Sequence, residues 1–264
     1  MKLTTFYDHV TDIAAQENIS VQEALRKTKE MGIDLLEVSN NNIAGREAEL
    51  KAEFAAAGLR VSSLCAYFDF GKTGYVEEQA IHALESTLQM GAARMLVIPG
   101  FIGEDSTTEE REAQTDKMIA AIAELQKEAQ KRNITLLLED YDHHTAPFAT
   151  IAGVQRFLDG IPQLMCAFDT GNFLYSGEDA EEAYALLKDR IGYVHLKDRN
   201  WKEMENGEKQ LCAAPVGGGV IPMEKLFANL RADGYDGPYA IELYGSGESL
   251  EHIRKSVEWL RERD

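Results

Sequence analysis

Four residues in the second half of the chain have side chains that can bind a metal ion, and each lies at or near the end of a short apolar run. The runs are "ITLLLE", "LMCAFD", "GYVHLK" and "YAIELY", and the residues are Glu139, Asp169, His195 and Glu242. Taken singly, such a carboxylate is most often a helix cap or an ion-pair partner, and such a histidine is most often a core residue. Together, three carboxylates and one imidazole suit Mn²⁺, Mg²⁺, Co²⁺ or Zn²⁺.

This chemistry requires the four side chains to meet, so the elements that carry them decide the interpretation. The stretch "CAFDTGNF" (166–173) is typical of a strand buried in a parallel sheet, because turn residues close an apolar run. Asp169 then lies at the carboxyl end of that strand, where parallel sheets and barrels bind ligands. Unpaired polar groups in an apolar barrel mouth would cost several kcal/mol each, so a divalent cation is the expected partner.

Eight β-rich runs alternate with eight amphipathic segments. The expected strands cover 3–7, 35–39, 59–68, 94–100, 134–139, 164–169, 192–197 and 239–244. The segments between them have apolar residues at three- and four-residue spacing, and one of them begins at Ser20 and ends at Gly32. No Pro/Ser-rich linker interrupts the series, and an open doubly wound sheet needs fewer strands. We therefore predict an α/β fold, a (β/α)₈ TIM barrel forming a single domain over residues 1–264.

The composition of the chain limits the kinds of molecule that it can bind. The chain has 27 Lys and Arg against 45 Asp and Glu, and the formal charge of −18 repels nucleic acid and anionic lipid. Its three cysteines form no CxxC pair, and it has neither a signal-peptide profile at its start nor an apolar run that could span a bilayer. We therefore expect a cytoplasmic protein that binds a small molecule and no nucleic acid or membrane, and we leave a homodimer open.

Five motifs, in this order and spacing, resemble the xylose isomerase-like TIM-barrel superfamily of sugar phosphate isomerases and epimerases. They are "LLLED", "FDTGN", "YVHLKD", "PVGGGVIPMEKL" and "YDGPYAIELY". The resemblance implies that Glu139, Asp169, His195 and Glu242 hold one metal, and that the two glutamates are also the catalytic acid and base. It further implies substrate contacts, which fall on Asn172, Lys197, Asp198 and Arg199. The ketose 3-epimerases have His where this chain has Asn172, which weakens assignment to that subgroup.

The chemistry that this resemblance implies is proton transfer beside a carbonyl group. The expected function is a sugar or sugar-phosphate isomerase or epimerase that works through an enediolate held on a divalent cation, with Mn²⁺ as the first choice. One glutamate removes the proton and the other returns one. Return to the opposite face of the same carbon gives an epimer, and return to the neighbouring carbon gives an aldose–ketose isomer.

Other functions stay open. The same metal and base could expel a β-hydroxyl from a keto-inositol or a dehydroshikimate-like acid, which is a dehydratase reaction; Lys197 and Arg199 are the only cationic pair near the expected face. The loop "PVGGGVIP" (215–222) could bind a substrate phosphate through backbone N–H groups, although a tight turn is slightly favoured. The net charge disfavours an apurinic-site endonuclease. The four intact ligand positions disfavour a non-enzymatic binding barrel.

Overall fold

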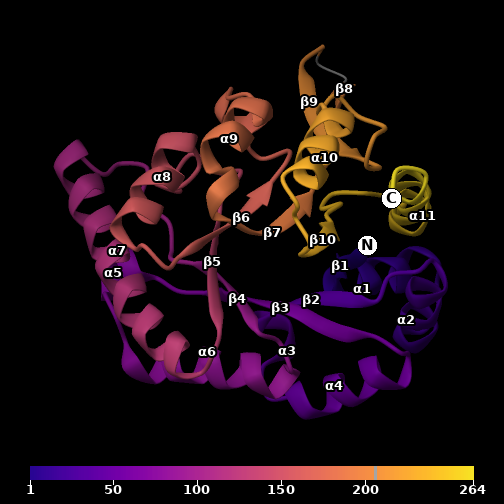
Figure 1. Cartoon of the computed structure of the whole chain (residues 1–264), viewed down its shortest axis with the longest axis horizontal. Helices are drawn as coiled ribbons and strands as arrows, with labels where there is room; N and C mark the ends of the chain where they lie inside the picture. Colours follow the sequence, from indigo (N-terminus) through magenta and orange to yellow (C-terminus); the bar gives the residue numbers. More distant parts are fainter. Residues whose placement is uncertain (205–206) are drawn as a thin grey trace.

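Eight parallel strands close into a barrel in the computed structural model, which describes residues 1–204 and 207–264 (Figure 1). β1 pairs with both β2 and β10, and this pairing completes the ring. The predicted TIM barrel is confirmed, with every strand near its expected position. The barrel strands are β1 (Lys2–Phe6), β2 (Leu35–Ser39), β3 (Arg60–Tyr67), β4 (Arg94–Ile98), β5 (Thr135–Glu139), β6 (Met165–Asp169), β7 (Ile191–Leu196) and β10 (Pro238–Ile241).

Helices follow the strands and pack around the barrel. Helix α2 begins where expected, because the Ser20 side chain accepts a hydrogen bond from the backbone N–H of Glu23. Gly32 follows this helix with a φ of +94°, a conformation that favours glycine. The longer helices are α1 (Tyr7–Gln16), α2 (Val21–Glu30), α4 (Glu47–Ala56), α6 (Glu77–Met90), α7 (Thr108–Lys131), α8 (Ile151–Gly160), α9 (Ala180–Leu187), α10 (Met223–Ala232) and α11 (Ser249–Arg261).

Short helical turns lie in several connections, including the loops after β2, β3 and β6. These loops are at the carboxyl ends of the strands, where the active face of a TIM barrel is built. The turns are α3 (Asn40–Ile43), α5 (Phe70–Thr73), η1 (Phe173–Ser176) and η2 (Lys188–Arg190).

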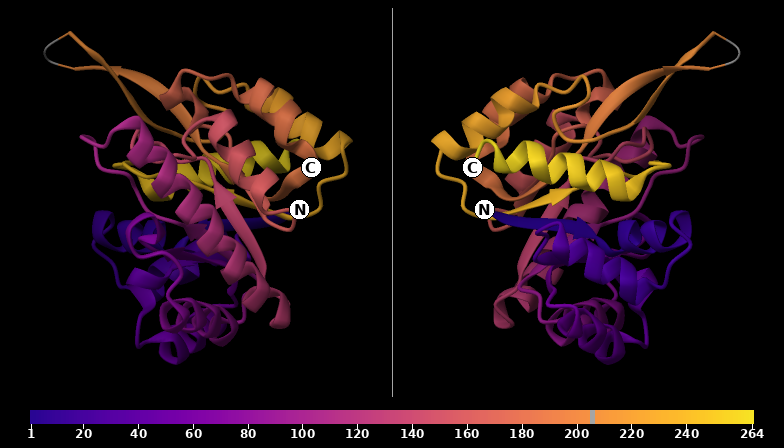
Figure 2. Two further views of the ribbon diagram at one scale, coloured as in Figure 1. Left: turned by 90° about the vertical axis from the view of Figure 1, so that its left-hand side faces the viewer. Right: turned by 90° about the vertical axis from the view of Figure 1, so that its right-hand side faces the viewer.

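Two elements differ from the sequence-based expectation. Helix α1 follows β1 directly, and its N-cap residue Phe6 makes no side-chain capping bond, so the sequence carries no start signal for it. After β7 the chain forms an antiparallel hairpin of β8 (Asp198–Glu203) and β9 (Lys209–Ala214), two strands beyond the eight that the sequence predicts. Figure 2 shows this hairpin projecting beyond the barrel.

The strand register brings polar groups to one height within a packed apolar core. Leu96, Leu137 and Ile241 are fully buried, as in a barrel whose interior is filled by side chains. Asp169 of β6 is paired in register with His195 of β7. Immediately beyond β10, the N–H of Glu242 donates to the carbonyl of Leu196 on β7, 3.1 Å away. Within the described part of the chain, no helix has the length and apolar character needed to cross a membrane.

Candidate active site and metal centre

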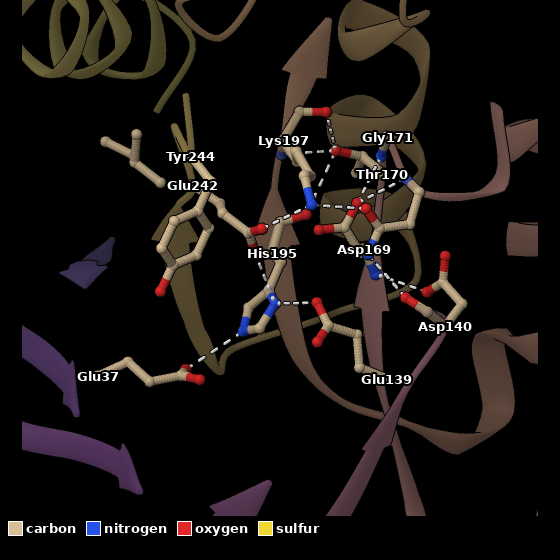
Figure 3. A network of polar contacts seen from close by, with 12 residues as sticks. Glu37, Glu139, Asp140, Asp169, Thr170, Gly171, His195, Lys197, Glu242 and Tyr244 are labelled. Carbon is tan, nitrogen blue, oxygen red and sulfur yellow. Dashed lines mark hydrogen bonds and ion pairs between the residues drawn. The ribbon is translucent and has the colours of Figure 1, made fainter. Parts of the chain in front are cut away.

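The four predicted ligands meet at the carboxyl end of the barrel (Figure 3). Their ligand atoms all lie within 4.8 Å of one another, and all four side chains are buried. They come from the ends of β5, β6 and β7 and from the residue that follows β10: Glu139, Asp169, His195 and Glu242. This buried cluster could bind a divalent cation.

His195 lies among three carboxylates. Its Nδ1 is 2.7 Å from Oε1 of Glu139 and 3.1 Å from Oε2 of Glu242, while its Nε2 is 3.2 Å from Oε2 of Glu37. Burial disfavours the imidazolium ion, but the charges of Glu37 and Glu139 outweigh that effect and raise the pKa of His195. The three carboxylates around the ring thus favour the protonated form of His195.

The two oxygens of the Asp169 carboxylate have different environments. Oδ1 accepts hydrogen bonds from the N–H groups of Gly171 (2.7 Å) and Asn172 (2.8 Å), which shapes the turn after β6. Oδ2 is buried and has no hydrogen-bond partner among the described residues. Burial also raises the pKa of Asp169. Because a buried oxygen without a partner is destabilising, this orphaned atom suits a cation ligand.

Lys197 supplies a second positive charge beside the cluster. Its Nζ lies 2.7 Å from Oε1 of Glu242, 2.6 Å from Oδ1 of Asn172 and 3.2 Å from Oδ2 of Asp142. Burial would disfavour the ammonium ion, but these carboxylates, led by Glu242, outweigh it and raise the pKa of Lys197. The Lys197 side chain therefore connects the metal-ligand cluster to the loops after β5 and β6.

The two glutamates of the cluster have opposite pKa shifts. Burial raises the pKa of Glu139 to about 7, despite the favourable charge of His195. Burial acts on Glu242 in the same direction, but Lys197 and His195 outweigh it and lower its pKa. Paired titratable groups whose pKa values are pushed apart are typical of acid and base roles.

A cavity of about 450 Å³ opens onto this cluster, within the size range of small-molecule sites. The predicted substrate-contact residues Asn172 and Lys197 line it, together with Glu139 and Glu242. Further residues line the cavity from β2 and β3 and from the segments that follow β1, β2, β5 and β10, and the sequence analysis did not single out Asp8, Glu37, Asp142 or Tyr244 among them. These further lining residues include Asp8, Glu37, Asn41, Asn42, Tyr67, Asp142 and Tyr244.

The other two predicted substrate contacts, Asp198 and Arg199, are absent from the described cavity lining. The Asp198 carboxylate accepts hydrogen bonds from the N–H of its neighbour Arg199 (2.9 Å) and from three N–H groups of the loop 215–222. Arg199 is buried, donates to Oδ2 of Asp142 over 3.2 Å and lies over the ring of Tyr175. Asp198 thus holds the loop in place, and Arg199 orients Asp142. Direct substrate contact by either residue stays a prediction.

The chain is similar to sugar epimerases along most of its length. A family model described as xylose isomerase-like TIM barrel matches residues 25–263. The 3-dehydro-D-guloside 4-epimerase of Escherichia coli (strain K12) is 23% identical over 260 residues, covering 92% of this chain and 94% of that protein. The L-ribulose-5-phosphate 3-epimerase UlaE of Salmonella paratyphi C (strain RKS4594) is 25% identical over 262 residues, covering 91% and 89%.

A solved structure of a protein with a different activity has the same fold. It is the probable 3-DHS dehydratase AsbF of Bacillus anthracis, which superimposes with a TM-score of 0.75 at 15% identity and covers 100% of both chains. At that identity the likeness concerns the fold alone.

Proposed function

The chain belongs to the xylose isomerase-like TIM-barrel family, and on that premise we propose that it is a metal-dependent sugar isomerase or epimerase. The observation that carries the proposal is the pair of buried glutamates, Glu139 and Glu242, on either side of the His195 Nδ1 atom. Removing a proton beside a carbonyl and returning one requires two such groups in one cavity, with different proton affinities. Similarity to two sugar epimerases along most of the chain supports the same reaction type.

Glu139, Asp169, His195 and Glu242 would hold one divalent cation, with Mn²⁺ as our first choice. When bound, such an ion supplies a Lewis acid for the substrate carbonyl. The chain's own carboxyl groups handle the protons. Both glutamates contact the His195 Nδ1 atom, so one carboxylate is placed to remove a proton beside the carbonyl and the other carboxyl group to return one.

Two buried cationic side chains orient the groups around the cluster. Lys197 holds Glu242 and Asn172 through its ammonium group, and Arg199 holds Asp142 through its guanidinium group. Such buried, mutually bonded side chains keep the carboxylates in place without reorganisation during the reaction.

The test is a substrate screen in deuterated water with added Mn²⁺, followed by NMR. We expect one ketose, aldose or keto-glycoside to acquire deuterium on a carbon beside the carbonyl while its epimer or isomer forms. Turnover without solvent label would indicate hydride transfer and contradict the proposal. Loss of water from the substrate would instead identify the dehydratase alternative.

A further inference from the structure

We infer that the substrate is an uncharged sugar or keto-glycoside and not a sugar phosphate; this inference rests on the proposed function and specifies its substrate class. Three features of the site carry it. They are a buried carboxylate that the glycine-rich loop binds, the excess of acidic groups in the cavity, and hydrogen-bonding groups at the cavity mouth.

The loop 215–222 has the backbone donors of a phosphate site, but a carboxylate already uses them. The Asp198 oxygens accept from the N–H groups of Gly217 (2.9 Å), Gly219 (3.0 Å) and Ile221 (3.2 Å), and the N–H of Arg199 completes the set at 2.9 Å. Asp198 is 1% exposed, so solvent phosphate has no access to these donors. The carboxylate therefore occupies the position that a phosphate group would take in such a nest.

Gly219 shows that this loop is built around Asp198. A Cβ atom on Gly219 would lie 2.2 Å from Oδ1 of Asp198 and 2.2 Å from the carbonyl oxygen of Arg199. Only a residue without a side chain can approach the carboxylate so closely. The glycine-rich sequence is thus explained by an internal contact, without a bound phosphate.

Acidic groups dominate the cavity that remains for the substrate. Lys197 is the one cationic side chain among its described lining residues, and its ammonium already contacts Glu242, Asp142 and Asn172. One divalent cation would offset only part of the negative charge, so a phosphate dianion would meet net repulsion. The acidic lining residues are Asp8, Glu37, Glu139, Asp142 and Glu242.

The mouth of the cavity suits sugar hydroxyl groups. The Asp8 carboxylate accepts hydrogen bonds from the Tyr244 hydroxyl (3.1 Å) and from the Asn42 side-chain amide. Asn41 lines the same cavity, and Tyr67 and Tyr244 are 39% and 42% exposed. Carboxylate and amide groups bind hydroxyls, and exposed aromatic rings offer an apolar wall to the face of a sugar ring. These groups recognise a polyhydroxylated molecule, and the described residues at the mouth add no cationic side chain that could bind a phosphate.

The test compares matched pairs by calorimetry on the Mn²⁺-loaded protein: L-ribulose with L-ribulose 5-phosphate, D-fructose with D-fructose 6-phosphate, and a methyl 3-keto-glucoside. We expect an uncharged member to bind roughly tenfold or more tightly than its phosphate ester, and inorganic phosphate not to compete. Tighter binding of a phosphate ester, competition by phosphate, or binding by no member of the panel would overturn the inference.

Two further measurements separate this inference from the proposed reaction. Solvent deuterium incorporation is followed on the same compounds; its absence from an uncharged sugar that binds tightly would refute the reaction and leave the substrate class supported. Asp8→Asn should weaken uncharged-sugar binding roughly tenfold, since it removes a charged acceptor at the mouth. The matched control is Asp12→Asn, whose side chain lies on the same helix, is 47% exposed and is absent from the described lining.

Discussion

The Glu37 carboxylate lies 3.2 Å from Nε2 of His195, although 158 residues separate the two in sequence. Figure 3 shows Glu37 on the side of the imidazole away from Glu139, Asp169 and Glu242. Oε1 of Glu37 has no hydrogen-bond partner among the described residues, so its contact with His195 is the principal polar interaction of this buried group. With Nε2–H donated to Glu37, a neutral His195 presents the lone pair of Nδ1 to the cluster.

Glu37→Gln should therefore weaken binding of Mn²⁺ by roughly tenfold to a hundredfold, because the amide cannot favour the metal-binding tautomer as a carboxylate does. Chelator competition measures the affinity. The matched control is Glu47→Gln, which changes a buried glutamate that accepts from Ser86 over 3.0 Å, away from the site. Equal affinities for the two variants would show that Glu37 has no effect on the histidine.

Asp169→Asn should abolish stoichiometric binding of a divalent cation, because it removes the charge of a ligand whose Oδ2 has no hydrogen-bond partner among the described residues. The amide oxygen can still accept from Gly171 and Asn172, so the turn after β6 should persist. Metal analysis of chelator-treated and reloaded protein checks this, with circular dichroism for the fold. Full metal content in both Asp169→Asn and His195→Ala would refute the ligand set.

Site residues at the end of a strand could be predicted from the sequence. Site residues whose partners are brought close by packing between distant elements could not. Glu139, Asp169 and Glu242 each close or follow an apolar run, and the barrel topology brings such positions together. Glu37 lies inside "LLEVS", where the single charge in an apolar strand was a usable signal that a partner lies elsewhere in the core. No such signal indicated that the Asp198 carboxylate accepts hydrogen bonds from the protein itself, because the loop N–H groups that donate to it lie 19 to 23 residues further along the chain.

The hairpin and helix α1 were missed for local reasons. The β8 segment "DRNWKE" is largely polar and exposed, so it shows no buried face that alternation could reveal. Helix α1 begins directly after Phe6 with no capping side chain. Helix α1 is positioned by the barrel strand that it follows, and the hairpin is held by the pairing of β8 with β9, so propensity within each segment contributes little.

Metal affinity should fall as the pH is lowered. Glu139 has a raised pKa of about 7 in the metal-free protein, so below that pH the cation must displace its proton. The raised pKa of His195 means that a second proton must leave as well. We expect affinity to fall roughly tenfold or more per pH unit below about pH 7. Calorimetry in buffers of different ionisation enthalpy counts the protons released; an affinity that is flat across this range would contradict the assignment.

Lys197→Met should destabilise the metal-free protein by about 3–5 kcal/mol, because it leaves the buried Glu242 carboxylate without its ammonium partner. Both side chains of that ion pair are 4% exposed. Urea unfolding in the presence of EDTA measures the change. Lys188→Met is the control, since Lys188 pairs with Asp233 at the surface and its loss should cost less than about 1 kcal/mol. Equal losses in the two variants would show that the buried pair contributes no more than the exposed one.

Glu139→Gln and Glu242→Gln should each lower turnover by roughly a hundredfold or more, because glutamine keeps the shape of the side chain and cannot exchange a proton. Both residues are also predicted metal ligands, so the assays need saturating Mn²⁺ to separate lost proton transfer from lost metal. NMR in deuterated water gives the sharper result: if the two carboxylates serve opposite faces of the substrate, one variant should still exchange the proton of one stereoisomer while failing to interconvert the pair. Full activity in either variant at saturating metal would exclude this pair as the acid and base.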